Sequence, residues 1–219
     1  RAAGGGRRAA AREPAPAPTA RIPGPISGVG QGAGCPLRCS YCDTREACEA
    51  PGNEFSTEEI LERVQRFETK LVEVTGGEPL AQPATPMLLK MLCDAGHRVL
   101  LETSGAYPIS ELDERVRVIV DMKTPGSGMW QQMEPANYSL DKGPEREVKF
   151  VVTSREDFDW AVAQCEEKRL FGRVELLVSP AKELVSDREL AEWLLSSGRE
   201  MRLQLQLHKQ LWPEGEGER

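Results

Sequence analysis

The sequence lacks two features that would assign it to common functional classes. It has no apolar run long enough to span a bilayer, which argues against a membrane-spanning protein. It also lacks an excess of positive charge, because 28 Lys and Arg stand against 35 Asp and Glu for a net charge of −7. Since contacts to nucleic-acid phosphates require clustered Lys and Arg, a broad nucleic-acid-binding surface is not expected. A chain of 219 residues is long enough for one sizeable domain with a buried core.

Residues 1–20 have hardly any of the large apolar side chains that a core needs. They consist mostly of Ala, Gly, Pro and Arg. Such a composition cannot bury a core face, so we predict that residues 1–33 are a low-complexity segment, disordered or artefactual. No apolar stretch follows Arg7-Arg8, so a twin-arginine signal is not indicated, whereas an Arg-rich organelle transit peptide stays an alternative.

Histidine is scarce, and cysteine is concentrated in one place. The chain has two histidines, His97 and His208, and six cysteines. Six cysteines in an otherwise ordinary, charged chain do not form the pattern of a secreted disulfide framework, so a reducing cytoplasm is the expected location. Three of the cysteines, Cys35, Cys39 and Cys42, fall within one short stretch.

The stretch from Gly34 to Thr44 is therefore the most informative part of the chain. Its three thiols can become thiolates, which are soft ligands for iron–sulfur clusters, zinc or copper. A structural zinc site takes four protein ligands, and a fourth is hard to find because the histidines are distant and Cys93 and Cys165 lie in helix-like segments. Three cysteines on one loop suit a [4Fe–4S] cluster in which three irons are held by protein and one is open to a small molecule.

Two less specific interpretations of the same loop stay open. The three cysteines can be unpaired loop thiols, or they can bind zinc together with Cys48. Otherwise Cys48 is an ordinary loop thiol, and Cys93 and Cys165 are expected to be core residues.

Hydrophobic periodicity predicts an α/β fold. Strands are expected at 71–75, 97–103, 116–122, 147–152, 174–178 and 201–207. Helices are expected at 56–69, 83–95, 109–115, 154–169 and 187–195. The first helix is expected to begin at a capping box formed by Ser56 and Glu59, and the second to turn Met87 inward. Alternating strands and helices predict a parallel sheet in a partial, open β/α barrel, with the site at the C-terminal ends of the strands.

A second motif, Thr75-Gly76-Gly77-Glu78-Pro79, follows the first of these strands. Two glycines at the end of a strand let the backbone approach a ligand closely. The adjacent carboxylate can accept hydrogen bonds from an ammonium group. Taken alone, this stretch is an ordinary turn. After a loop with three cysteines, it is a candidate binding site.

Together, the two motifs resemble the radical S-adenosylmethionine superfamily and, within it, the 7-carboxy-7-deazaguanine synthase family. In the superfamily pattern, Tyr41 is the aromatic residue before the third cysteine, and Gly76-Gly77-Glu78 is the segment for the amino group of the cofactor. The narrower resemblance rests on residues 35–44, 74–80, 102–105, 121–128 and 204–209. It implies a radical-enzyme domain of the partial-barrel type over residues 34–212, followed by an acidic tail at 213–219.

The resemblance implies a ring-contracting lyase on the route to queuosine and other 7-deazapurines. Such an enzyme converts 6-carboxy-5,6,7,8-tetrahydropterin to 7-carboxy-7-deazaguanine with loss of ammonia. The implied cofactors are a [4Fe–4S] cluster, S-adenosylmethionine and Mg²⁺. The implied partners are the small pterin substrate, flavodoxin or ferredoxin as electron donor, and a second copy of the chain in a homodimer.

The same resemblance assigns the site residues, none of them catalytic beyond the cluster and the cofactor. Cys35, Cys39 and Cys42 are expected to hold the cluster, Thr44 to bind Mg²⁺, and Thr75 and His208 to contact the substrate. Contacts to S-adenosylmethionine are expected from Tyr41, Cys42, Asp43, Gly76, Gly77, Glu78, Ser104, Lys123 and Ser127. Without the resemblance, Thr44 reads as a turn residue, Lys123 as a solvated lysine and His208 as a surface or core histidine.

The chain departs from the family pattern just before the cysteine loop. Family members begin with a strand that carries a Gln-Gly-Glu-Gly turn, and a second strand with an arginine leads into the loop. Here Gln31-Gly32-Ala33-Gly34 directly precedes Cys35, with alanine in place of glutamate. We therefore expect the first strand and part of the substrate site to be missing. Two alternatives stay open: a degenerate inactive family member, and a glycyl-radical activase, which the stretch from Asp121 to Lys123 also resembles.

Overall fold

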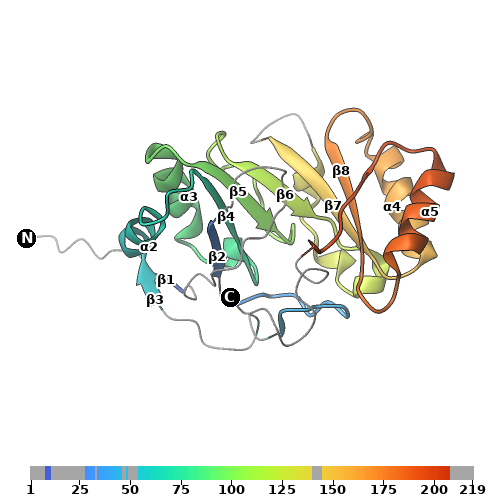
Figure 1. The fold of residues 1–219 in the computed structure, drawn as a ribbon, viewed down its shortest axis with the longest axis horizontal. Helices are drawn as coiled ribbons and strands as arrows, with labels where there is room; N and C mark the ends of the chain where they lie inside the picture. Colours follow the sequence, from blue (N-terminus) through green and yellow to red (C-terminus); the bar gives the residue numbers. More distant parts are fainter. Residues whose placement is uncertain are drawn as a thin grey trace, which may run out of the picture.

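The computed structural model describes residues 8–10, 28–32, 34–45, 48, 54–139 and 145–207. Their main feature is a seven-stranded sheet in which the order of the strands equals their order along the chain (Figure 1). The strands are β2 (Gly28–Gly32), β4 (Leu71–Gly76), β5 (Arg98–Thr103), β6 (Arg117–Asp121), β7 (Arg146–Val152), β8 (Glu175–Pro180) and β9 (Arg202–Leu203). All neighbours pair in parallel, which confirms the predicted α/β fold with an open parallel sheet.

Among the described residues, four helices cover the outer face of this sheet. They are α2 (Thr57–Val64), α3 (Thr85–Asp94), α4 (Arg155–Glu167) and α5 (Asp187–Ser197). One apolar cluster joins β4, β5 and β6 to α3, with α2 at its margin, and a second joins β7 and β8 to α4 and α5. In Figure 1, α2 and α3 lie toward one end of the sheet, and α4 and α5 lie toward the other. In the described part of the chain, the inner face carries a small apolar cluster formed by Leu71, Leu100, Ile119 and Leu177.

The local signals at the start of α2 are confirmed, whereas its predicted length is wrong. The Ser56 hydroxyl accepts from the Glu59 backbone N–H, and the Glu59 carboxylate accepts from the Ser56 N–H, as a capping box requires. The helix ends at Val64 rather than near residue 69, and Phe67 is 47% exposed. Among the described helices, none has the length and the apolar composition that crossing a membrane requires.

Two further predictions about helices are wrong. Met87 is 58% exposed, because the inward face of α3 is set by Leu89 and Leu92 instead. Residues 109–115 form a series of turns rather than a helix. The first backbone N–H of that segment donates to the Asn137 side chain at 3.1 Å, so a long-range contact decides its conformation.

Short 3₁₀ turns follow two of the strands. The chain after β6 makes three 3₁₀ turns, η2 (Pro125–Ser127), η3 (Trp130–Gln132) and η4 (Pro135–Tyr138). A further one, η1 (Pro79–Ala81), follows β4. The last strand, β9, has two residues, although the alternation over 201–207 predicted a longer one.

The N-terminal segment contains strands that were not expected. β1 (Arg8–Ala10) pairs antiparallel with β3 (Glu54–Ser56) in a separate two-stranded sheet. β2 pairs in parallel with β4 and leads into the cysteine loop. Of residues 1–33 the structure describes only 8–10 and 28–32, so the expected disorder of this segment stays a prediction. The expected loss of the first strand of the large sheet is wrong, because β2 lies next to β4. A glycine-rich strand pairs through its backbone alone, so it leaves no side-chain pattern to detect.

Candidate functional site

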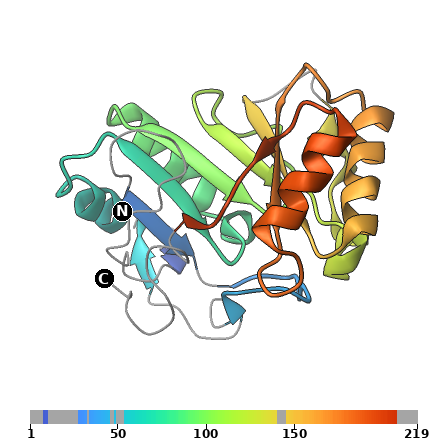
Figure 2. The ribbon, with the colours of Figure 1, turned by 45° about the vertical axis from the view of Figure 1, so that its right-hand side comes forward.

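The predicted site residues meet at the edge of the sheet where the strands end. The cysteine loop, residues 34–45, follows β2, and the Gly76-Gly77 turn closes β4. Ser104 follows β5, and Lys123 follows β6. The cysteine loop, light blue in Figure 2, passes below the ends of the strands. Because the carboxyl ends of parallel strands share one edge, residues far apart in the sequence are brought together there.

The cysteine loop is fixed by hydrogen bonds within the loop and by hydrogen bonds to η2. Arg38 Nη1 donates to the Cys35 carbonyl at 2.8 Å, and Cys42 N donates to the Cys39 carbonyl at 3.2 Å. Ser40 N donates to the Ser127 carbonyl at 3.0 Å. The loop therefore has both internal turns and a long-range attachment.

The three cysteines of the loop fit a cluster by the chemistry of their donors. Cys35, Cys39 and Cys42 are free thiols of intermediate exposure. Burial raises the pKa of the Cys39 thiol, an effect that Lys123 opposes and Asp121 reinforces. In the described part of the chain, no three His, Cys, Asp or Glu side chains are gathered closely enough to hold a metal ion. Binding of a cluster therefore has to draw the three thiols together.

Gly77 is required by the close approach of two loops. A Cβ at this position would overlap the Gly34 carbonyl oxygen and would lie 2.7 Å from the carbonyl carbon. Glu78 N donates to the same oxygen at 2.8 Å. The turn after β4 and the start of the cysteine loop are thus in direct contact, and no side chain fits between them.

The Glu78 carboxylate is fully buried and is occupied by protein donors. Thr103 Oγ1 donates to its two oxygens at 2.9 and 3.0 Å, and the Ser104 and Leu80 backbone N–H groups donate at 2.7 and 2.8 Å. The Ser104 hydroxyl is a further donor. Glu78 therefore ties the turn after β4 to the end of β5, a structural role that sequence reasoning missed.

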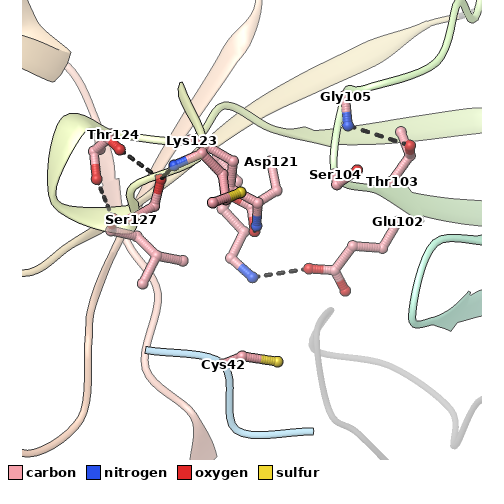
Figure 3. A network of polar contacts seen from close by, with 12 residues as sticks. Cys42, Glu102, Thr103, Ser104, Gly105, Asp121, Lys123, Thr124 and Ser127 are labelled. Atoms are coloured by element: carbon pink, nitrogen blue, oxygen red, sulfur yellow. Dashed lines mark hydrogen bonds and ion pairs between the residues drawn. The ribbon is translucent and has the colours of Figure 1, made fainter. Parts of the chain in front are cut away.

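Lys123 is a buried cation next to the cysteine loop. Its Nζ lies 2.7 Å from Asp121 Oδ2 and 5.8 Å from the centre of the Tyr41 ring. Burial alone would lower the pKa of Lys123, but the charges of Asp121, Tyr41 and Cys39 raise it above its usual value. Figure 3 shows Asp121 and Lys123 between Ser104 and the turn that contains Thr124 and Ser127. Among the described groups, Asp121 Oδ1 and the Tyr41 hydroxyl are buried without a hydrogen-bond partner.

A second buried ion pair lies on the inner face of the sheet. Lys149 Nζ on β7 lies 2.8 Å from Glu102 Oε1 on β5, and both side chains are largely buried. The dashed line to Glu102 in Figure 3 marks this pair. Sequence reasoning did not find it, because the two residues are far apart in the chain and each fits an ordinary strand pattern.

The other predicted residues differ in how well they reach the site. Thr44 Oγ1 is 4.0 Å from Cys42 Sγ, and Asp43 Oδ2 accepts from Gln206 Nε2 at 3.0 Å. His208 lies outside the described residues. The hydrogen bond to Asp43 brings the end of the described chain to the cysteine loop.

Two hydroxyl residues complete the predicted set. Thr75 is half-buried near the end of β4, next to the glycine turn. Ser127 is fully buried, and its hydroxyl donates to the Thr124 carbonyl at 2.6 Å while it accepts from Met129 N at 3.0 Å. Thr75 is thus accessible to a ligand, whereas the Ser127 hydroxyl stabilises its own turn.

Comparisons with known proteins agree with this arrangement. Residues 31–161 match the model of the radical SAM superfamily. A 7-carboxy-7-deazaguanine synthase from Chlorobaculum tepidum is 43% identical over 188 residues, which is 84% of this chain and 85% of that protein. A protein of the same name from Koribacter versatilis is 36% identical over 84% of this chain and 87% of that protein. The crystal structure of QueE from Escherichia coli covers 91% of this chain and 94% of its own with a TM-score of 0.69, and at 19% identity it shows the fold alone.

Proposed function

Because the chain belongs to the 7-carboxy-7-deazaguanine synthase family within the radical S-adenosylmethionine superfamily, we propose that it is a ring-contracting lyase of 7-deazapurine biosynthesis. The reaction converts 6-carboxy-5,6,7,8-tetrahydropterin to 7-carboxy-7-deazaguanine with loss of ammonia, on the route to queuosine. The observation that carries the proposal is the direct contact of the cysteine loop with the Gly76-Gly77 turn, in a loop whose Tyr41 ring lies 5.8 Å from Lys123 Nζ.

In this proposal Cys35, Cys39 and Cys42 hold a [4Fe–4S] cluster, because they are free soft donors on one short loop. When bound, the cluster and S-adenosylmethionine supply the electron transfer and the hydrogen-atom abstraction. The chain itself positions the glycine turn and the cysteine loop relative to each other. Gly77 leaves no side chain between the turn and the loop, so the backbone there stays close to the thiols.

Lys123 is proposed to bind a carboxylate at the edge of the sheet. Its raised pKa keeps it positively charged, and an ammonium group has three donors, of which Asp121 occupies one. The unpartnered Asp121 Oδ1 is suited to accept from a hydroxyl group of the cofactor. Glu78 and Ser104 act on S-adenosylmethionine through the shape of the turn after β4, since their side chains bond to one another.

The remaining roles are assigned by family pattern and by position. Thr44 is proposed to bind Mg²⁺ through its hydroxyl, a hard oxygen donor near the cysteine loop. Thr75 and His208 are proposed to contact the pterin. Tyr41 and Asp43 lie within the loop that contacts the cofactor.

The partners and the setting are also proposals. A flavodoxin or ferredoxin is the proposed electron donor, since radical chemistry of this type needs a low-potential reductant. We propose a homodimer in a reducing cytoplasm, where partly exposed loop thiols stay reduced. The proposed radical-enzyme domain extends to residue 212 and is followed by an acidic tail at 213–219.

The test is one anaerobic assay on the reconstituted protein. It contains S-adenosylmethionine, dithionite, Mg²⁺ and 6-carboxytetrahydropterin, and mass spectrometry measures 7-carboxy-7-deazaguanine and 5′-deoxyadenosine. We expect product from the unmodified chain and from Cys48→Ala, and none from Cys39→Ala. Product that depends equally on Cys48 would contradict the assignment of three cluster ligands.

The same assay separates the alternatives. Deoxyadenosine without deazaguanine means that the cofactor site works and the substrate site does not, as in an enzyme for another substrate. Neither product, with iron and labile sulfide present, means an inactive family member. The second outcome has a structural basis, because β2 offers neither a glutamate nor an arginine next to the cysteine loop.

A further inference from the structure

Asp157 is a buried carboxylate that none of the proposed roles uses. It lies in the first turn of α4 and is 3% exposed. Its oxygens accept four hydrogen bonds: from Thr124 Oγ1 at 2.9 Å, Gly126 N at 2.9 Å, Thr153 N at 3.0 Å and Thr153 Oγ1 at 2.7 Å. A buried carboxylate with this many donors is a fixed point of the structure.

The carboxylate does not serve the start of its own helix. Ser154 caps α4 and accepts from Asp157 N at 3.3 Å. Glu59 in α2 and Glu189 in α5 occupy the same third position, and their carboxylates return to the cap residue to complete a capping box. Asp157 turns instead to the ends of β6 and β7, so its side chain serves a long-range contact.

The geometry around Gly126 shows how close that contact is. A Cβ at this position would overlap Thr153 Oγ1 and Asp157 Oδ2, and would lie 3.0 Å from Asp157 Cγ. η2 is therefore seated directly on the carboxylate. Through Thr124 and Gly126, Asp157 fixes both sides of Pro125 in the turn that follows Lys123.

η2 also holds the cysteine loop. The Gly126 carbonyl accepts from Ser40 Oγ at 2.7 Å, and the Ser127 carbonyl accepts from Ser40 N at 3.0 Å. Ser40 directly follows Cys39 and precedes Cys42 by two positions. A continuous series of hydrogen bonds thus runs from α4 through η2 to the middle of the cysteine loop.

We propose that Asp157 is a positioning residue for the cluster loop. It fixes η2, and η2 fixes Ser40 and thereby the segment from Cys39 to Cys42. A loop that is already held in place loses less conformational entropy when it binds a ligand, so loss of Asp157 weakens retention of the cluster. The inference rests on the proposed function only in that this loop binds a [4Fe–4S] cluster.

The test compares Asp157→Asn with Asp159→Asn, a variant in the same helix whose carboxylate is exposed and pairs with Arg155. Asparagine keeps the size of the side chain, but its NH₂ group cannot accept from Gly126 N or from the threonines. After anaerobic reconstitution, iron per chain and the rate of iron transfer to a ferrous chelator are measured without substrate. We expect several-fold faster iron release from D157N and the wild-type rate from D159N.

Ser40→Ala tests the last step of the series and removes one hydrogen bond on the exposed side of the loop. We expect it to accelerate iron release, and the double variant with D157N to release iron little faster than D157N alone, because both act on one path. Thermal unfolding of the apoproteins separates this effect from general destabilisation. A lowered Tm for D157N with wild-type iron release would overturn the proposal.

If D157N folds poorly, Ser40→Ala alone still tests the proposal. Wild-type iron release from Ser40→Ala would then overturn the proposal, and accelerated release would support it. Failure of the proposed function looks different. If the wild-type protein retains its cluster but makes no deazaguanine, it is not this lyase, and the proposed role of Asp157 stands. If the wild-type protein binds no iron, both the proposed function and the proposed role of Asp157 are overturned.

Discussion

Glu78 shows that a carboxylate in a predicted binding motif can form its hydrogen bonds with the protein itself. The glutamate after Gly76-Gly77 is expected to meet an ammonium group, because carboxylates bind cations. In the structure its carboxylate is fully buried and accepts from Thr103, Ser104 and Leu80. In the structure the carboxylate therefore holds the turn after β4 to the end of β5.

We expect Glu78→Gln to lower the free energy of unfolding of the apoprotein by about 2–3 kcal/mol. The amide NH₂ cannot accept the hydrogen bonds that the lost oxygen accepted, so buried donors on Thr103 or Ser104 lose their partner. Guanidinium denaturation measures the change, and the exposed Glu111→Gln serves as a control with an expected change within about 0.5 kcal/mol. Wild-type stability together with weakened binding of S-adenosylmethionine would instead assign the carboxylate to the cofactor.

At the scale of elements, charge on the inner face helps to hold the shortest strand. Glu147 on β7 has a side chain that is 8% exposed; its oxygens lie 2.9 Å from Arg117 Nε on β6 and 3.2 Å from Arg202 Nη2 on β9. β9 has two residues and pairs with β8 through two Cα partners. The ion pair from a buried carboxylate therefore adds to the backbone pairing with β8 and to the packing of Leu203 against the core.

We expect Glu147→Gln to loosen β9 more than it destabilises the whole sheet. Both arginines are more than a third exposed, so solvent screening limits the expected loss to about 1–2 kcal/mol. Hydrogen exchange should become faster in residues 201–207 and change little in β4 and β5. Glu175→Gln is the matched control, since Glu175 is 45% exposed and lies 3.5 Å from Arg202 Nη1. Equal effects of the two variants would show that burial of Glu147 adds nothing.

For the molecule as a whole, most of the fold could be predicted from the sequence, because most of its elements depend on local patterns. Capping residues, alternation and Gly-rich turns all act within a few residues, and they place the strands and most helices. The exceptions involve contacts that no local pattern encodes. The conformation of residues 109–115 is set by a hydrogen bond to the Asn137 side chain. β2 is rich in glycine, so its sequence has almost no side-chain pattern that would predict a strand.

The site divides in the same way. Cys35, Cys39, Cys42 and Gly77 could be singled out from the sequence, because the spacing of cysteines and a glycine pair are visible in a short window; their roles as cluster ligands and cofactor contacts stay predictions. The partners that hold them were not. Asp157 and the Glu102–Lys149 pair acquire their roles only when strands β5, β6 and β7 are assembled, since each contact joins residues that are far apart in the chain.

The two buried thiols, compared with thiols of the cysteine loop, give a test of the assembled fold. Cys93 and Cys165 are 8% and 0% exposed, and burial raises the pKa of both, to about 12 for Cys165. Since the thiolate is the reactive form, we expect iodoacetamide at pH 8 to modify Cys35 and Cys42 in the native apoprotein but neither core thiol. Peptide mass spectrometry measures the modification, and labelling of both core cysteines in urea shows that they are intrinsically reactive. Modification of native Cys165 at the rate of Cys42 would contradict the packing of α4.

The same thiol has a consequence for stability that depends on pH. The folded protein keeps the Cys165 proton up to about pH 12, whereas an unfolded chain releases it near the ordinary value of 9.0. The native state therefore binds more protons between these values, so the contribution of Cys165 is fully present below pH 9 and decreases as the pH rises. We expect denaturation of Cys165→Ala to show a shallower loss of stability above pH 9 than the unmodified chain. An identical pH dependence would mean that Cys165 already releases its proton within the folded protein.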